Sequence, residues 1–121
     1  MRNISKVVLL DENTFKVLWS LGNEVTDTYK TLDERHSFYH QHHVQLLPSG
    51  YIIMMDNHTS PPAQHKIGSR ISIYGIDKNT KKAQIVWNYQ PKNKIHIGNR
   101  GSTYLLKNEN ILAFYPVSLN L

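Results

Sequence analysis

Cysteine is absent from this sequence of 121 residues. A disulfide framework, a thiolate nucleophile and a metal site built from thiolates are therefore excluded. Long apolar runs are absent too, because none approaches the roughly 20 residues that a membrane-spanning helix requires, so we predict no membrane partner. The apolar residues 7–10 are interrupted at Asp11 and predict a strand rather than a signal peptide.

Acidic side chains are scarce beside basic ones, nine against fourteen, which gives a net charge of +5 and a pI of about 9.5. A basic chain can gain affinity for nucleic acid through counterion release. The basic residues form only two thin local groups, which are Lys78, Lys81 and Lys82, and Lys92, Lys94 and Arg100. Scattered lysines of this kind usually keep a sheet edge soluble. We therefore predict no nucleic-acid partner.

The chain repeats its own pattern. An Asp-x-Asn-Thr turn occurs at residues 11–14 and again at 77–80, and each turn leads to an apolar run that ends in Trp19 or Trp87. A second type of hairpin follows each copy. In the first copy, Pro48-Ser49-Gly50 separates two apolar runs, and in the second, Asn108-Glu109-Asn110 takes that place. No segment shows a helical pattern.

This order of hairpins predicts an all-β fold. We expect antiparallel four-stranded blades of the β-propeller type, incomplete at about two blades, in a single partial domain 1–121 with repeats at 7–57 and 71–115. Propellers usually have about four to eight blades, so we expect a homo-oligomer or further blades to complete the structure. Two sheets folded into an open sandwich are the alternative. Trp19 and Trp87 should be buried between sheets.

The hairpin around Pro48-Ser49-Gly50 places His42 and Asn57 at the same end of the sheet. Two loops, residues 22–39 and 58–68, border that end, and binding residues usually lie on loops held by a rigid sheet. An imidazole beside an amide is therefore a candidate site. A solvated hairpin with no function is the alternative.

Four of the seven histidines lie close together in the sequence, at positions 36, 40, 42 and 43. His40 and His42 would face the same side of a strand, and imidazole pairs bind zinc. A third ligand could come from His36, Asp56 or His58, but the spacing matches no strong zinc pattern. We therefore predict no metal and no cofactor, and interpret these histidines as partly exposed residues on a loop and sheet rim.

Several short motifs occur in an order that resembles the arylsulfotransferase family over roughly residues 7 to 118. They are Trp19-Ser20-Leu21-Gly22, Gln41-His42-His43, Leu47-Pro48-Ser49-Gly50, Asp56-Asn57, Ser69-Arg70, Tyr74-Gly75-Ile76-Asp77, Val86-Trp87-Asn88-Tyr89, Gly101-Ser102 and Asn110-Ile111-Leu112. The resemblance implies a propeller enzyme that moves a sulfuryl group from an aryl sulfate to a phenol. It also suggests a location outside the cytoplasm.

Carried over residue by residue, the resemblance implies that His42 is the catalytic residue, and that Gln41, His43, Asn57 and Arg70 bind the substrate. Family members often carry an arginine soon after Asp-Asn, whereas this chain has His58-Thr59-Ser60-Pro61-Pro62 there. A histidine in further blades is the alternative nucleophile. A non-catalytic propeller-repeat module that binds a ligand or a protein partner is the alternative function.

Overall fold

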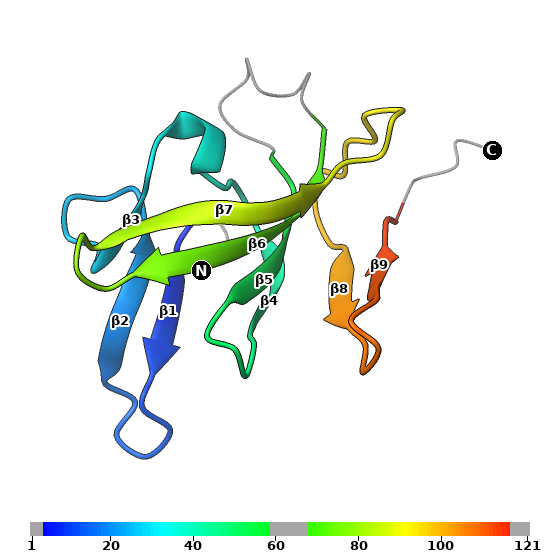
Figure 1. Cartoon of the computed structure of the whole chain (residues 1–121). Coiled ribbons are helices and arrows are strands. Elements are labelled where there is room, and N and C mark those ends of the chain that lie inside the picture. Colours follow the sequence, from blue (N-terminus) through cyan, green and yellow to red (C-terminus); the bar gives the residue numbers. More distant parts are fainter. Residues whose placement is uncertain (1–3, 59–67, 117–121) are drawn as a thin grey trace.

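The computed structural model describes residues 4–58 and 68–116, so the Pro-Pro part of the second predicted loop lies outside the described residues. The fold is all-β (Figure 1). Its strands are β1 (Val7–Leu10), β2 (Val17–Gly22), β3 (Tyr29–Thr31), β4 (His42–Leu46), β5 (Ile52–Asp56), β6 (Arg70–Asp77), β7 (Lys82–Tyr89), β8 (Ser102–Leu105) and β9 (Ile111–Phe114). One 3-10 turn, η1 (Glu34–His36), is an exception to the predicted absence of helix, and Asp33 caps it by accepting from the Arg35 backbone N–H.

The four predicted hairpins are all present, as β1–β2, β4–β5, β6–β7 and β8–β9. The two Asp-x-Asn-Thr turns have the same hydrogen bonds. Asp11 Oδ1 accepts from the backbone N–H groups of residues 13 and 14 at 3.0 and 2.7 Å, and Asp77 Oδ1 accepts from those of residues 79 and 80 at 2.8 and 3.2 Å. These bonds lower the pKa of both carboxyl groups, led in each case by the bond from the Thr backbone N–H.

Seven strands form one sheet in the order β1-β2-β3-β7-β6-β5-β4, and β8–β9 stands apart as a two-stranded ribbon. Strands β4 to β7 make a continuous antiparallel meander over residues 42–89, which is the arrangement expected of a single blade. This meander combines one hairpin from each predicted repeat. The short β3 pairs in parallel with both β2 and β7, which the sequence pattern did not predict.

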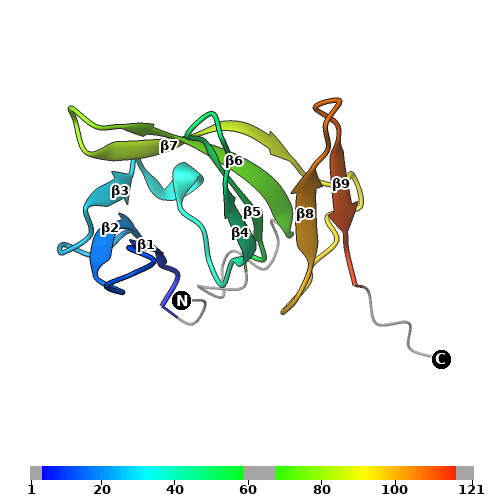
Figure 2. The same ribbon diagram turned by 90° about the horizontal axis from the view of Figure 1, so that it is seen from below.

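The seven-stranded sheet curls into a nearly closed barrel, as Figure 2 shows from below. Its two edges meet where the Gln41 side chain donates to the Lys6 carbonyl at 2.8 Å and the His40 N–H donates to Ser5 Oγ at 3.1 Å. The interior holds the larger core cluster, formed by Val7, Leu21, Tyr29, Phe38, Ile52, Met54, Tyr74 and Ala83. The 3-10 turn joins this interior, because Tyr74 Oη donates to the His36 carbonyl at 2.6 Å.

The opposite face of β5 and β6 carries a second core. Ile53, Met55 and Ile71 are buried there beneath residues of β9, including Ile111 and Ala113. All five residues of β5 are consequently buried, since both faces of this strand are covered. The close approach of β8 requires a glycine: Gly101 has φ +95°, and a Cβ at this position would lie 2.9 Å from Met55 Cγ.

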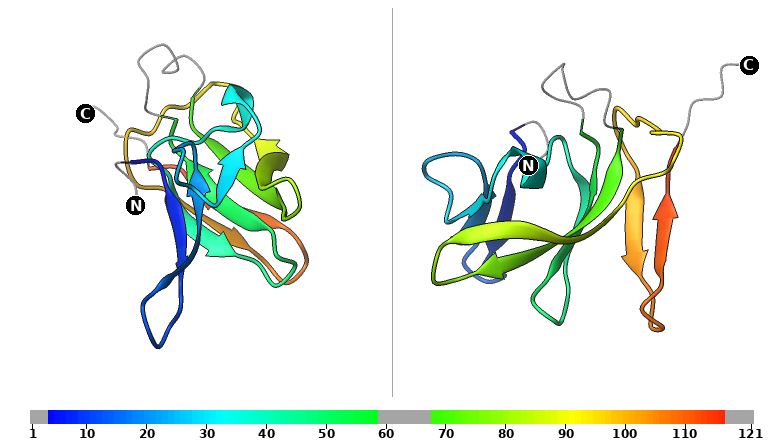
Figure 3. Two further views of the ribbon diagram at one scale, coloured as in Figure 1. Left: turned by 90° about the vertical axis from the view of Figure 1, so that its left-hand side faces the viewer. Right: turned by 45° about the horizontal axis from the view of Figure 1, so that its top comes forward.

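The prediction that both tryptophans are buried between sheets is wrong for Trp87, which is 43% exposed. Trp87 lies on the face of β7 that carries the second core, and the β8–β9 ribbon covers only part of that face (Figure 3). Trp19 is half-buried and packs edge-on against Tyr29, with ring centroids 5.9 Å apart. Trp87 is therefore exposed because the β8–β9 ribbon does not extend over the part of β7 that carries it.

Within the described residues, β9 pairs only with β8, so its other edge has no strand neighbour. Leu112 and Phe114 of β9 are 57% and 60% exposed. Unpaired apolar edges promote association, so we expect the isolated chain to self-associate and Leu112→Lys or Phe114→Lys to reduce that association. Light scattering against protein concentration measures it. Val25→Lys is the control, because Val25 is 87% exposed in a loop. A cooperative monomer at all concentrations would contradict this expectation.

Tyr74 is fully buried, and this burial raises the pKa of its hydroxyl well above 10.0. The contribution of the neutral Tyr74 hydroxyl to the free energy of unfolding is therefore fully present below about pH 10, the unfolded-state pKa. It is lost as the pH rises through the folded-state pKa. We expect Tyr74→Phe to destabilise the fold by about 1–2 kcal/mol at neutral pH, because the His36 carbonyl loses its donor, and to flatten the alkaline loss. Urea unfolding at neutral and alkaline pH measures both effects. At neutral pH, the half-exposed Tyr51→Phe should change stability little.

Candidate functional site

His42 and Asn57 meet at one end of the β4–β5 hairpin. His42 opens β4, Asn57 directly follows β5, and antiparallel pairing brings His42 Nδ1 to 2.6 Å from Asn57 Oδ1. The Asn57 amide nitrogen donates to the carbonyls of Ile97 and Arg100 at 3.0 and 2.9 Å, so its oxygen is the atom that faces the imidazole. An amide oxygen only accepts, and Nδ1 must therefore carry the proton. In neutral His42 the lone pair is then on Nε2.

The loop between β7 and β8 covers this end of the sheet. Its Arg100 backbone N–H donates to His42 Nε2 across 3.3 Å, which is a long and solvent-exposed contact. Ser69 anchors the loop from below, since its hydroxyl donates to the Asn57 carbonyl at 2.9 Å and accepts from the Ile97 N–H at 2.8 Å. Asn57 and Ser69 are both fully buried. The half-buried imidazole thus has a partner at each nitrogen, the buried Asn57 oxygen at Nδ1 and the longer contact from the Arg100 N–H at Nε2.

His43 and Gln41 lie beside His42 but are engaged by other parts of the fold. The β4–β5 register shifts after His42, so that His43 and Val44 together face Met54, and His43 has φ +49°. His43 Nδ1 accepts from the Thr103 N–H at 3.2 Å, and its ring lies 4.5 Å from that of Tyr104. Gln41 is 4% exposed and closes the barrel through Lys6. These contacts join β4 to β8 and to the start of β1.

The structure does not bring Arg70 together with His42. Arg70 pairs with Asp56 in the β5–β6 register, on the face of the barrel interior, whereas His42 pairs with Met55 on the other face. Each nitrogen of its guanidinium donates to a protein acceptor: Nε to Asp56 Oδ2 at 2.9 Å, Nη2 to the Ser37 carbonyl at 2.7 Å and Nη1 to the Arg35 carbonyl at 3.2 Å. Arg70 therefore holds the loop before β4.

The polar cluster around Asp56 was not predicted from the sequence. Asp56 is fully buried and also accepts from the backbone N–H groups of Tyr39 and His58 at 2.9 and 3.1 Å. The His58 imidazole Nδ1 lies 3.3 Å from Asp56 Oδ2. A buried charge requires such pairing. In the sequence, Asp56 and His58 were considered only as conceivable third ligands of a metal site, and the position of Asp56 after an apolar strand gave no further signal.

The family model described as Arylsulfotransferase (ASST) matches residues 1–115. The chain belongs to the arylsulfotransferase family. No curated protein and no solved structure matched the sequence. The family resemblance expected from the ordered motifs is confirmed.

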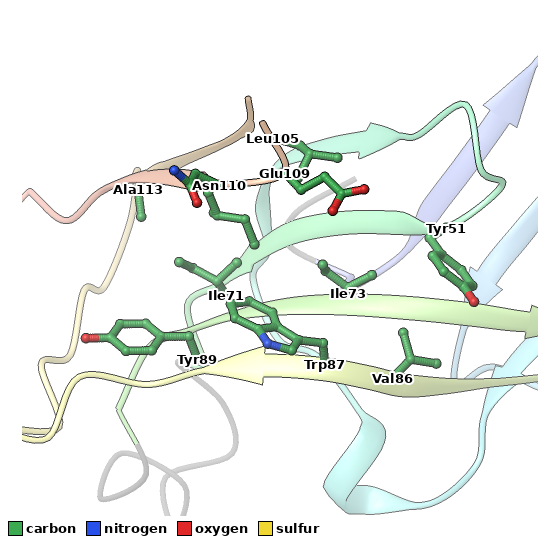
Figure 4. A pocket seen from close by; sticks show the side chains of 11 residues that line it. Tyr51, Ile71, Ile73, Val86, Trp87, Tyr89, Leu105, Glu109, Asn110 and Ala113 are labelled. Atoms are coloured by element: carbon green, nitrogen blue, oxygen red, sulfur yellow. The ribbon is translucent and has the colours of Figure 1, made fainter. Parts of the chain in front are cut away.

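This arylsulfotransferase family member also has an apolar groove, whose lining does not include His42. It has a volume of about 620 Å³ and separates the outer face of β6 and β7 from the β8–β9 ribbon (Figure 4). Tyr51, Trp87 and Tyr89 contribute aromatic side chains to it, and Glu109 contributes an acidic one. The groove and His42 therefore lie on the same face of the sheet, at separate positions.

Neither a cluster of metal-ligating side chains nor a membrane-spanning helix is found in residues 4–58 and 68–116. No group of three or more histidine, aspartate and glutamate side chains in this part of the chain is placed to hold a metal ion. His42 and His43 instead have hydrogen-bond partners in Asn57 and β8. None of the described helical residues forms a helix that is long and apolar enough to cross a membrane.

We predict that neutral His42 is protonated at Nδ1 and that Asn57→Ala yields a mixture of both tautomers, because the accepting oxygen is lost. Imidazole nitrogen chemical shifts measure the tautomer. Ser69→Ala is the matched control, since it loosens the same loop without touching the imidazole and should keep the Nδ1–H form. An Nε2–H tautomer in the unmodified protein would show that the assignment is wrong.

Proposed function

We propose that this chain supplies part of an active site for sulfuryl transfer from an aryl sulfate to a phenolic acceptor, with His42 as the nucleophile. The observation that carries the proposal is the contact between His42 Nδ1 and Asn57 Oδ1, which leaves the lone pair on Nε2. In the structure this lone pair accepts the long contact of 3.3 Å from the Arg100 N–H, which a substrate at Nε2 would have to displace. Membership of the arylsulfotransferase family supports the reaction class. Further residues of the site would lie in the additional blades that the sequence led us to expect.

The proposed reaction has two displacements at sulfur. In the first, the His42 Nε2 lone pair forms a bond to sulfur while the bond from sulfur to the aryl oxygen breaks, and the phenolate leaves with the electron pair. In the second, the acceptor phenol gives its proton to a base as its oxygen attacks sulfur, and the nitrogen–sulfur bond breaks. The imidazole is cationic between these steps, and the Asn57 oxygen stabilises the Nδ1–H that bears part of that charge.

The neighbouring residues act in this proposal by positioning. Asn57 fixes the imidazole ring, and His43 and Gln41 fix the start of β4 against β8 and Lys6. Arg70 and Asp56 hold the loop that precedes β4 from the opposite face. The substrate-binding role first considered for Arg70 would require its guanidinium to give up these acceptors.

A binding module is the second candidate function. The observation that favours it is the apolar groove of about 620 Å³, whose aromatic lining suits a flat apolar ligand. In that case a phenol should bind at Trp87 and Tyr89, away from His42. A ligand that changes the Trp87 fluorescence but not the His42 resonances would favour this candidate.

Mixing the protein with 4-nitrophenyl sulfate and a phenol tests the enzymatic proposal. We expect release of 4-nitrophenolate, a covalent sulfuryl group on the peptide that contains His42, and a loss of at least about a hundredfold in His42→Ala. His43→Phe is the matched control, because it keeps an aromatic ring against Tyr104 while removing the imidazole. The absence of label, turnover and any His42 resonance shift in the unmodified protein would refute the proposal.

A further inference from the structure

We infer that a hollow at the opposite end of the barrel from His42 binds a small aromatic anion. The ligand class is a flat aromatic ring with one negatively charged substituent, which aryl carboxylates and aryl sulfates share. The hollow has a volume of about 500 Å³, and Tyr51 is the one residue that it shares with the apolar groove described above. This inference is independent of the proposed function, because it requires no chemistry at His42.

The hollow is formed where two turns and β2 meet. His42 begins β4 and Leu46 ends it, so the turn after Leu46 lies at the far end of the β4–β5 hairpin from the candidate site. Leu46 and residues of that turn line one side of the hollow. Ile76 near the end of β6 and Lys78 in the turn to β7 line a second side, and Trp19 of β2 lines a third.

The walls of the hollow suit a flat ring. Trp19 packs edge-on against Tyr29 with ring centroids 5.9 Å apart, and Tyr51 adds a third aromatic side chain. Trp19 is half-buried, and Leu46 and Tyr51 are 50% and 47% exposed, so apolar surface of several residues faces one space. Apolar and aromatic walls with a few polar groups are typical of small-molecule sites, whose volumes are about 300–1,000 Å³.

The charge around the hollow is positive. Lys78 lines it, and none of the described acidic side chains does. Lys81, from the same turn, has its Nζ 5.4 Å from the centre of the Tyr29 ring. Neither lysine forms an ion pair within the part of the chain that the structure describes. The adjacent Asp77 is engaged in the turn itself, where its Oδ1 accepts from two backbone N–H groups.

A small aromatic anion matches both properties. Its ring would lie against Trp19 and Tyr51, and its charge would lie beside the Lys78 ammonium, which acts on an anionic group as a point charge. The turn that carries the lysines is held in place by β3, since the Lys30 N–H donates to the Lys81 carbonyl at 3.1 Å. The sequence pattern indicated only a soluble sheet edge at these lysines.

Quenching of Trp19 fluorescence by 4-nitrobenzoate tests the inference. The chain has two tryptophans, so Trp87→Phe leaves Trp19 as the one indole and removes the indole that lines the groove. We expect saturable quenching, and binding about threefold to fivefold weaker when Lys78→Gln is added, because an exposed positive charge is lost. Adding Leu46→Glu instead should weaken binding by at least about tenfold, because it places a negative charge in the wall.

Lys107→Gln and Val17→Glu are the matched controls, because both positions are exposed and lie outside the hollow. Each should bind 4-nitrobenzoate within about 1.5-fold of the Trp87→Phe protein, and the neutral analogue 4-nitrobenzamide should bind equally well with and without Lys78→Gln. 4-Nitrophenyl sulfate, measured in the same way, distinguishes the two sources of the anion. The probe that binds more tightly identifies the hollow as a site for aryl carboxylates or for aryl sulfates.

The absence of saturable quenching, or unchanged affinity for 4-nitrobenzoate in Lys78→Gln, would overturn the inference. The indole N–H resonance of Trp19 in the unmodified protein is a second readout that needs no substitution at Trp87. It should shift on addition of 4-nitrobenzoate, and an unshifted resonance would also overturn the inference. None of these measurements involves His42, so their failure leaves the proposed function standing, and a failure to label His42 leaves this inference standing.

Discussion

The buried amide of Asn57 is the interaction on which the rest of the site depends. It links three parts of the chain that are distant in sequence: the end of β5, the imidazole at the start of β4, and the loop that leads to β8. A buried amide with unmet hydrogen bonds would be costly, so each of its bonds constrains the others. The tautomer of His42 is therefore a consequence of how the loop packs, and the loop packs this way because Ser69 and Asn57 hold its carbonyls and N–H groups.

Strand β5 supplies the second constraint, because both of its faces are buried. Ile52 and Met54 face the barrel interior, and Ile53 and Met55 face the β8–β9 ribbon. The polar residues at the end of β5 follow the same alternation. Asp56 lies on the interior face, where it binds Arg70, and Asn57 lies on the other face, where it binds His42. The two polar clusters thus share one end of the sheet while they remain on opposite sides of it.

Much of the fold was predictable because the signals are local. The turns at Asp11, Pro48, Asp77 and Asn108 fix four hairpins, and the pairing of His42 with Asn57 follows from one of them. The separation of Arg70 from His42 was not predictable, since it depends on the register between β5 and β6 across an intervening loop. A shift of one residue in that register would reverse the faces. The exposure of Trp87 was not predictable either, because it depends on how the β8–β9 ribbon packs against β7.

The sequence by itself determined the strand content, the turns, the absence of thiol chemistry and the family, because each of these is encoded in short segments or in the order of motifs along the chain. Only the tertiary structure decided the curl of the seven-stranded sheet, the parallel pairing of β3, the burial of Asp56 and the placement of Arg100 over His42. The contact between Arg100 and His42 joins residues 58 positions apart. No local pattern encodes such a contact, because it results from the packing of two cores on opposite faces of one sheet.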